Sequence, residues 1–146
     1  MDTVGSIIEE KGGDVFTVPP SASVTQAVQT MSRRRVGAVL VCSEGRCVGI
    51  FTERDVMNRV VLTGIDPGGT AVADVMTPEV ACVEPGTTAV EAMAIMTERH
   101  CRHLPVIRGG EIVGMISIGD LVRRESRNQQ FEIRMLTDFI LGKYPG

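Results

Sequence analysis

Two short segments place a hydroxyl three residues before a carboxylate: Thr52 precedes Asp55, and Ser117 precedes Asp120. Each segment follows an apolar, strand-like run and begins a helical pattern, so each is predicted to form a helix N-terminus. Free backbone N–H groups favour phosphate there, and the hydroxyl can donate to the same phosphate. A carboxylate repels phosphate but can accept hydrogen bonds from both hydroxyls of a ribose. The segments therefore predict phosphate and diol recognition one helical turn apart, as in a nucleotide site.

The same residues have a purely structural alternative. Ser or Thr at the N-cap with an acid three residues later is close to a capping box, and Asp in a first turn favours the helix dipole. Under this alternative the chain is a ligand-independent scaffold or interaction protein that acts through its C-terminal helix.

Further residues could complete a nucleotide site. Three glycines would let a ligand or backbone approach closely: Gly37, Gly49 and Gly114. An apolar slot for a base could be formed by Phe16, Val36, Ile50 and Met115. Arg102 and His103 could neutralise phosphate, although a solvated charge and a surface histidine are the simpler interpretations.

Other chemistries have weaker support. His100, Cys101 and His103 enter a predicted strand and would point to alternate faces, which is poor geometry for one metal ion. The chain has two His and no G-x-S-x-G segment, so no enzyme activity is predicted. Its four cysteines lack C-x-x-C spacing, and we interpret them as reduced core thiols of a cytoplasmic protein; they are Cys42, Cys47, Cys82 and Cys101.

An internal repeat must position these groups. Shifting the sequence by 65 residues aligns Val15 with Val80, Met31 with Met96, and Asp55 with Asp120 without a gap. Each copy predicts a strand, an amphipathic helix, a hairpin of two strands and a second helix. The fold class is therefore mixed α/β (α+β), with tandem β-α-β-β-α repeats related by a pseudo-twofold axis and with terminal helices.

The same pattern sets the expected boundaries. The predicted strands are 15–18, 38–41 and 47–51 in the first copy, and 80–83, 104–107 and 112–116 in the second. The predicted divisions are an N-terminal helical segment 1–14, a first repeat 15–66, a linker 67–79, a second repeat 80–124 and a helical tail 125–146. In the tail, Phe131, Met135 and Phe139 form a stripe that could contact a partner, a dimer mate or its own domain.

Composition excludes several classes of partner. The 146 residues carry a net charge of −3 and only 3% aromatic residues, which argues against nucleic-acid binding. No apolar run approaches the roughly 20 residues that span a bilayer, and the N-terminus lacks a basic signal region. We therefore expect a cytoplasmic protein without nucleic-acid or membrane partners.

Taken as a set, these segments resemble a known family. The doubled unit, the run from Arg102 to Ile107, the link from Ala73 to Pro78 and the two hydroxyl–carboxylate motifs are similar to the CBS-domain pair, or Bateman module. The resemblance implies an energy or redox sensor that modulates a partner protein and usually forms a homodimer. It implies no required cofactor, but a regulatory adenine ligand: AMP foremost, otherwise ADP, ATP, NAD(H) or S-adenosylmethionine.

The resemblance also implies two ligand clefts, each combining the motif of one repeat with contacts from the other. One would use Ser117 and Asp120 with Phe16, Val36, Gly37, Arg102 and Met115. The other would use Thr52 and Asp55 with Ala38, Ile50, Ala81 and Cys101, while His103 would reach phosphates between them. The chain departs from the family pattern where Arg102 and His103 exchange order and where Leu40 replaces a proline. The Asp120 site is therefore the expected site for a phosphorylated ligand.

Overall fold

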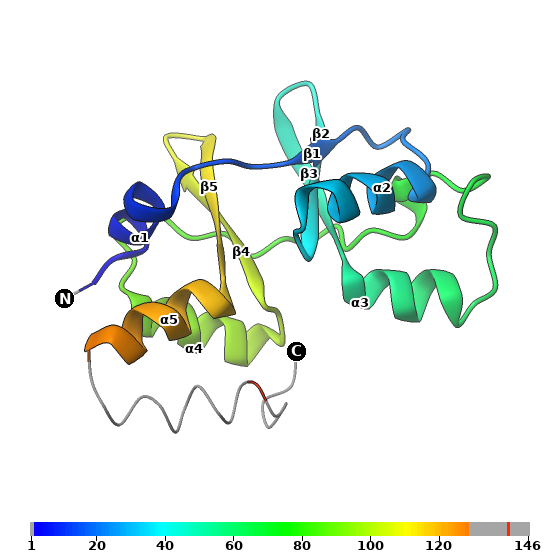
Figure 1. Cartoon of the computed structure of the whole chain (residues 1–146). Coiled ribbons are helices and arrows are strands. Elements are labelled where there is room, and N and C mark those ends of the chain that lie inside the picture. The colour runs from blue at the N-terminus through cyan, green and yellow to red at the C-terminus, as the bar shows by residue number, and fades with distance from the viewer. Residues whose placement is uncertain (1, 129–139, 141–146) are drawn as a thin grey trace. The chain divides into compact units, whose positions relative to one another are not determined.

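A computed structural model describes residues 2–128 and residue 140 (Figure 1). The described residues form two compact units: residues 15–80 make the first, and residues 2–14 together with those from 81 onward make the second. Each contains helices and a small sheet in the same order. The predicted mixed fold class with a repeated unit is confirmed.

In the first unit a three-stranded sheet is flanked by helices. Strand β1 (Thr17–Val18) pairs in parallel with β2 (Ala38–Ser43), which pairs antiparallel with β3 (Arg46–Thr52). Helix α2 (Val24–Arg34) connects β1 to β2, and β3 leads into the short helix α3 (Glu53–Asp55). The turns that follow are a π-helix, η1 (Val56–Val61), and a 3₁₀ helix, η2 (Val72–Asp74).

The second unit repeats this order around a hairpin of β4 (His103–Arg108) and β5 (Glu111–Ser117). Helix α4 (Ala89–Arg99) precedes the hairpin, α5 (Ile118–Asn128) follows it, and α1 (Val4–Lys11) joins them from the N-terminus. The strand predicted at 80–83 is a single parallel bridge between Val83 and Val106. The strand predicted at 15–18 is reduced to the two residues of β1. The four predicted hairpin strands are present, each with two more residues in total than predicted.

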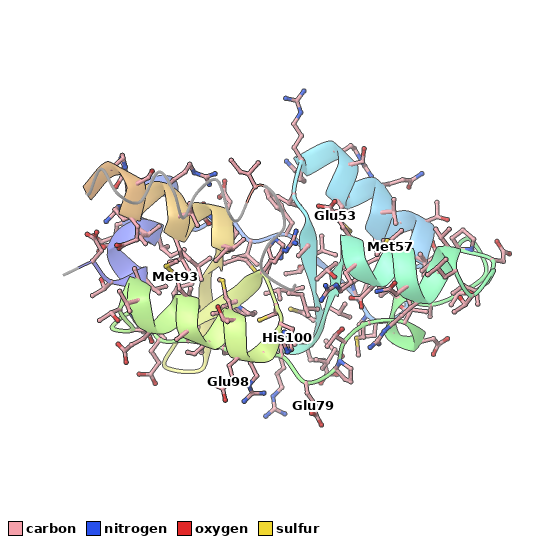
Figure 2. All side chains as sticks on the ribbon, turned by 90° about the horizontal axis from the view of Figure 1, so that it is seen from below. Glu53, Met57, Glu79, Met93, Glu98 and His100 are labelled. Atoms are coloured by element: carbon pink, nitrogen blue, oxygen red, sulfur yellow. The ribbon has the colours of Figure 1, made fainter. Side chains whose placement is uncertain are left out.

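Local sequence explains where the two long helices begin and end. Ser23 and Thr88 cap the N-termini of α2 and α4, and Gln26 and Glu91 complete the two capping boxes. Arg35 and His100 end these helices in the left-handed conformation, with φ of 56° and 54°. Figure 2 shows His100 at the end of α4.

Each unit buries its own apolar core. In the first, Phe51 is the largest fully buried side chain of a cluster that includes Val24, Ala27, Val39, Val41 and Val72. In the second, Leu104 and Ile116 lie among Val4, Ala92, Met96, Val106 and Leu121. Phe51 and Ile116 directly precede Thr52 and Ser117, so core packing fixes the start of both motifs.

The segment that leads into each repeat packs on the other repeat. The N–H of Val4 donates to the Thr87 carbonyl at 2.8 Å, and the N–H of Val72 donates to the Ala22 carbonyl at 2.7 Å. Since Ala22 and Thr87 occupy the same place in the two copies, α1 completes the second unit as residues 72–77 complete the first.

Because each leading segment packs on the other repeat, two glycines have a role other than the one predicted. Gly49 and Gly114, expected to admit a ligand or backbone, are instead covered by the side chains of Met76 and Ile8. A Cβ on Gly114 would lie 2.7 Å from Cδ1 of Ile8. These glycines therefore seat the leading segments on β3 and β5.

Gly114→Ala is expected to lower the free energy of unfolding by about 1–2 kcal/mol, because the methyl group would displace Ile8. Gly86→Ala is the matched control, since a Cβ at Gly86 meets nothing within 4 Å. Urea unfolding of both variants measures the difference. Equal stabilities would contradict the proposed seating of Ile8.

The predicted tail helix with Phe131, Met135 and Phe139 falls on residues outside those the structure describes, since α5 is described to Asn128. Among the described residues, no helix is long and apolar enough to cross a bilayer.

Candidate functional site

The first motif forms a complete capping box at the start of α3. The N–H of Thr52 donates to Oδ2 of Asp55 at 3.0 Å, and the N–H of Asp55 donates to Oγ1 of Thr52 at 3.4 Å. The capping role that the sequence pattern also allowed is thus present. Asp55 itself is only 5% exposed.

Two side chains not assigned to the site by sequence also contact the Asp55 carboxylate. Thr77 donates its hydroxyl to Oδ1 at 3.2 Å, and Nε of Arg59 lies 3.6 Å from the same oxygen. Arg59 also donates to the Met76 carbonyl at 2.8 Å. Thr77 belongs to residues 72–77, the segment before the second repeat, so spacing within the motif gives no signal for this contact.

The second motif forms the same box at the start of α5. The N–H of Ser117 donates to Oδ2 of Asp120 at 2.9 Å, and the N–H of Asp120 donates to Oγ of Ser117 at 3.2 Å. Here the carboxylate also faces two cations. Lys11 Nζ lies 2.7 Å from Oδ2, and Arg123 Nη2 lies 2.8 Å from Oδ1.

These partners determine what Asp120 can bind. Burial alone would raise the pKa of Asp120, but hydrogen bonding and charge from Lys11, with the bonds from Ser117, hold that pKa below its usual value. The carboxylate is therefore an acceptor at neutral pH, with about four lone-pair positions. The contacts from Ser117, Lys11 and Arg123 use three. A diol needs two, so one cation must move, and the Arg123 side chain, 69% exposed, is free to do so.

A groove of about 400 Å³ runs between α1 and α5 beside Asp120. Four of its lining side chains are basic and two are acidic: Lys11, Arg123, Arg124 and Arg127 against Glu10 and Asp120, with Ile7 and Ser126 completing the wall. The excess of positive charge favours an anionic group in this groove.

The other predicted residues divide between the units. The first unit holds Phe16, Val36, Gly37, Ala38 and Ile50, and the second holds Ala81, Cys101, Arg102, His103 and Met115. Sheet register places Ala38 opposite Thr52 and His103 opposite Ser117. The Arg34 guanidinium lies over the ring of Phe16, with its central carbon 5.0 Å from the ring centre.

At the start of each motif helix, one backbone N–H already donates a hydrogen bond to a carbonyl group. The N–H of Glu53 donates to the Gly37 carbonyl at 3.0 Å, and that of Ile118 donates to the Arg102 carbonyl at 2.9 Å. An incoming phosphate would therefore have fewer free donors at each terminus than an uncapped helix offers.

His103 does not carry the positive charge that the sequence suggested. Burial, followed by the nearby Lys11 and Arg102 charges and opposed by Asp120, lowers the pKa of His103 to about 4. At neutral pH its imidazole can share a hydrogen bond but cannot neutralise phosphate. Arg102, which is exposed, keeps the predicted charge.

The cysteine and histidine side chains do not assemble into a metal centre in the described part of the chain: no group of three or more His, Cys, Asp or Glu residues could hold an ion there. No disulfide joins the four cysteines. Cys82 is exposed and the others are partly exposed, so none is fully buried as expected for core thiols, although Cys101 packs against the apolar core of the second unit.

Comparison with known proteins identifies the repeated unit. The CBS-domain family model matches residues 4–62 and 72–127. The CBS domain-containing protein CBSX3, mitochondrial, of Arabidopsis thaliana is 34% identical over 151 residues, covering 97% of this chain and 73% of that protein.

Solved structures show the same fold. A CBS-domain protein from Burkholderia ambifaria superposes with a TM-score of 0.83 and 40% identity, covering 87% of this chain and 96% of the other. A CBS-domain protein from Pyrobaculum aerophilum, solved in complex with AMP, gives a TM-score of 0.73 over 81% and 88% of the two chains. Its identity is 21%, so that likeness is one of fold.

Proposed function

The chain belongs to the CBS-domain family, and we propose that its two repeats form a regulatory module that binds an adenine nucleotide and modulates a partner protein. The observation that carries the proposal is the repeated capping box, in which each unit presents a hydroxyl and a carboxylate at a helix N-terminus. AMP is the leading ligand, and ADP, ATP, NAD(H) and S-adenosylmethionine are the others. The AMP-bound Pyrobaculum structure is a precedent within the same fold.

Asp120 is the proposed ribose acceptor of the site that takes a phosphorylated ligand. Its carboxylate is anionic, and the groove beside it carries more basic than acidic side chains. Asp55 is the weaker acceptor, because Thr52 and Thr77 already donate to it and it is 5% exposed. Arg102 supplies charge to phosphate in this proposal, while His103 supplies at most a hydrogen bond. A homodimer is part of the same proposal.

A ligand-independent scaffold is the second candidate function. It is favoured by one observation: both carboxylates already have protein partners in these capping boxes and ion pairs. Under this function no nucleotide would bind in a defined ratio.

A thermal-shift panel with AMP, ADP, ATP, NAD, NADH and S-adenosylmethionine separates the two functions. A ligand at 100 times its dissociation constant stabilises the folded protein by about 2.7 kcal/mol, which raises the melting temperature by several degrees. We expect such a shift with at least one adenine ligand. The absence of any shift, in protein refolded to remove bound nucleotide, would contradict the sensor and favour the scaffold.

A further inference from the structure

Cys42 and Cys47 face each other across the hairpin of β2 and β3. The sheet register pairs Cys42 with Cys47 and, next to the turn, Ser43 with Arg46. The two turn residues have positive φ, 53° at Glu44 and 76° at Gly45, as in a type I′ turn. Such a turn makes the Ser43–Arg46 pair hydrogen-bonded, so the two cysteines form the adjacent non-hydrogen-bonded pair, in which side chains lie closer together.

This geometry suits a covalent bridge. Cα atoms in a non-hydrogen-bonded pair lie about 4.5 Å apart, within the range of roughly 4.4–6.8 Å that disulfides bridge. After burial, the neighbouring Cys47 thiol contributes to the raised pKa of the Cys42 thiol, and it donates to the Gly49 carbonyl at 3.5 Å. Both side chains are partly exposed, so a small reagent can reach them.

The second unit shows that this position does not require thiols. The equivalent pair in its hairpin is Ile107 and Ile112, at the same bulge in the register. An apolar pair therefore satisfies the packing. The fold accepts cysteines here, and of the two described hairpins the first places a pair of them opposite each other.

We propose that Cys42 and Cys47 form a dithiol site that low-molecular-weight disulfides, such as glutathione disulfide, oxidise to an intramolecular disulfide. Burial raises the pKa of the Cys42 thiol, which makes Cys42 the poorer first nucleophile, so Cys47 loses its proton to water and attacks first. Its sulfur displaces one glutathione thiolate, which takes a proton from water. Cys42 then loses its proton to water and attacks the Cys47 sulfur, releasing the second glutathione. Two protein thiols are oxidised while one glutathione disulfide is reduced to two thiols.

The bridge would be readily reversed. It closes a loop of only a few residues near an exposed turn, and exposed disulfides are the more easily reduced class. Reducing agents would therefore restore both thiols. The site is independent of nucleotide binding, because no residue proposed for the ligand takes part in it.

The test uses the full chain in glutathione buffers of increasing disulfide content, followed by alkylation and tryptic peptide mapping. Trypsin cleaves after Arg46, between the two cysteines, so the bridge would join the peptides 36–46 and 47–54. We expect a loss of two of the four alkylatable thiols, this linked peptide pair, and recovery of both thiols with dithiothreitol.

Matched variants assign the loss to this pair. Cys82→Ser with Cys101→Ser should leave the linked peptides unchanged, whereas Cys42→Ser should abolish them. If Cys42→Ser fails to fold, the peptide map of the wild type still decides. The proposal is overturned if both cysteines stay alkylated in folded protein at the most oxidising ratio. A stable glutathione adduct without the linked pair, or a bridge to Cys82 or Cys101 instead, would also overturn it.

Discussion

Lowering the pH from 7.5 to 5 is expected to destabilise this protein by about 2 kcal/mol through His103 alone. The folded-state pKa of His103 is about 4, below the ordinary value of 6.5, mainly because the imidazole is largely removed from water. Between these values the unfolded chain binds a proton that the folded chain excludes. The contribution of His103 to the free energy of unfolding is therefore fully present above pH 6.5. It is lost as the pH falls toward 4, where the loss reaches about 3 kcal/mol.

Urea unfolding at several pH values measures this effect in wild type and in His103→Asn. The variant should lose the wild-type slope between pH 6.5 and 5, a window above the range in which most carboxylates titrate. His100→Asn is the matched control, because His100 is exposed and Asn tolerates its left-handed backbone. Parallel pH curves for wild type and His103→Asn, or an imidazole NMR titration near pH 6.5, would show that His103 is not held neutral.

Replacing Arg124 with Met is expected to lower the free energy of unfolding by about 1.5–3 kcal/mol, the range for a hydrogen bond to a charged group, because Arg124 is buried while its carboxylate partners are partly exposed. Arg124 is a residue of α5 that is 8% exposed, and its side chain reaches the N-terminal segment. Its Nη1 donates to Asp2 at 2.9 Å and to Ser6 at 3.4 Å, and its Nη2 pairs with Glu10. The Met side chain keeps the packing of the stem but holds no carboxylate, so α1 should loosen.

Arg127→Met provides the control on the same helix. Arg127 pairs with the same Glu10, but its side chain is 59% exposed, so its loss should change stability little. Hydrogen exchange should show faster exchange of the α1 amides in Arg124→Met and near-normal exchange in Arg127→Met. Equal, small effects of both substitutions would mean that Arg124 does not fasten α1 to this unit.

The sequence predicted the parts of this fold that depend on local pattern. The hairpin strands and the long helices appear where alternation, apolar spacing and capping residues indicated, because those signals act within a few residues. The strand expected at 80–83 is reduced to one bridge, since pairing depends on a distant partner. The sequence predicted a second helix in the first repeat, but its pattern did not distinguish the π-helical turns Val56–Val61 from an α-helix.

The candidate site was also predicted only as far as local sequence pattern reaches. Spacing alone identified both hydroxyl–carboxylate pairs, but not the cations and hydroxyls that reach them from elsewhere. Lys11 lies 109 residues from Asp120, and Thr77 comes from the segment before the other repeat. Sequence alone also left the charge of His103 open, because burial, which no motif reports, lowers its pKa.

Calorimetric titration with the most stabilising ligand of the nucleotide panel tests the central claim most directly. The proteins compared are wild type, Asp120→Asn, Asp55→Asn and the double variant. Asparagine can still accept the N–H of Ser117 or Thr52, so the capping boxes and the fold should survive, as circular dichroism would verify. Loss of a charged acceptor for the ribose hydroxyls should weaken binding by about tenfold or more, since such hydrogen bonds contribute about 1.5–3 kcal/mol.

The account predicts a defined binding ratio for wild type, the larger loss of affinity for Asp120→Asn, and no measurable binding for the double variant. Unchanged affinity in all three folded variants would contradict the assignment of these carboxylates to the ribose. Failure of folded wild type to bind any nucleotide in the panel would contradict the nucleotide-sensing function itself.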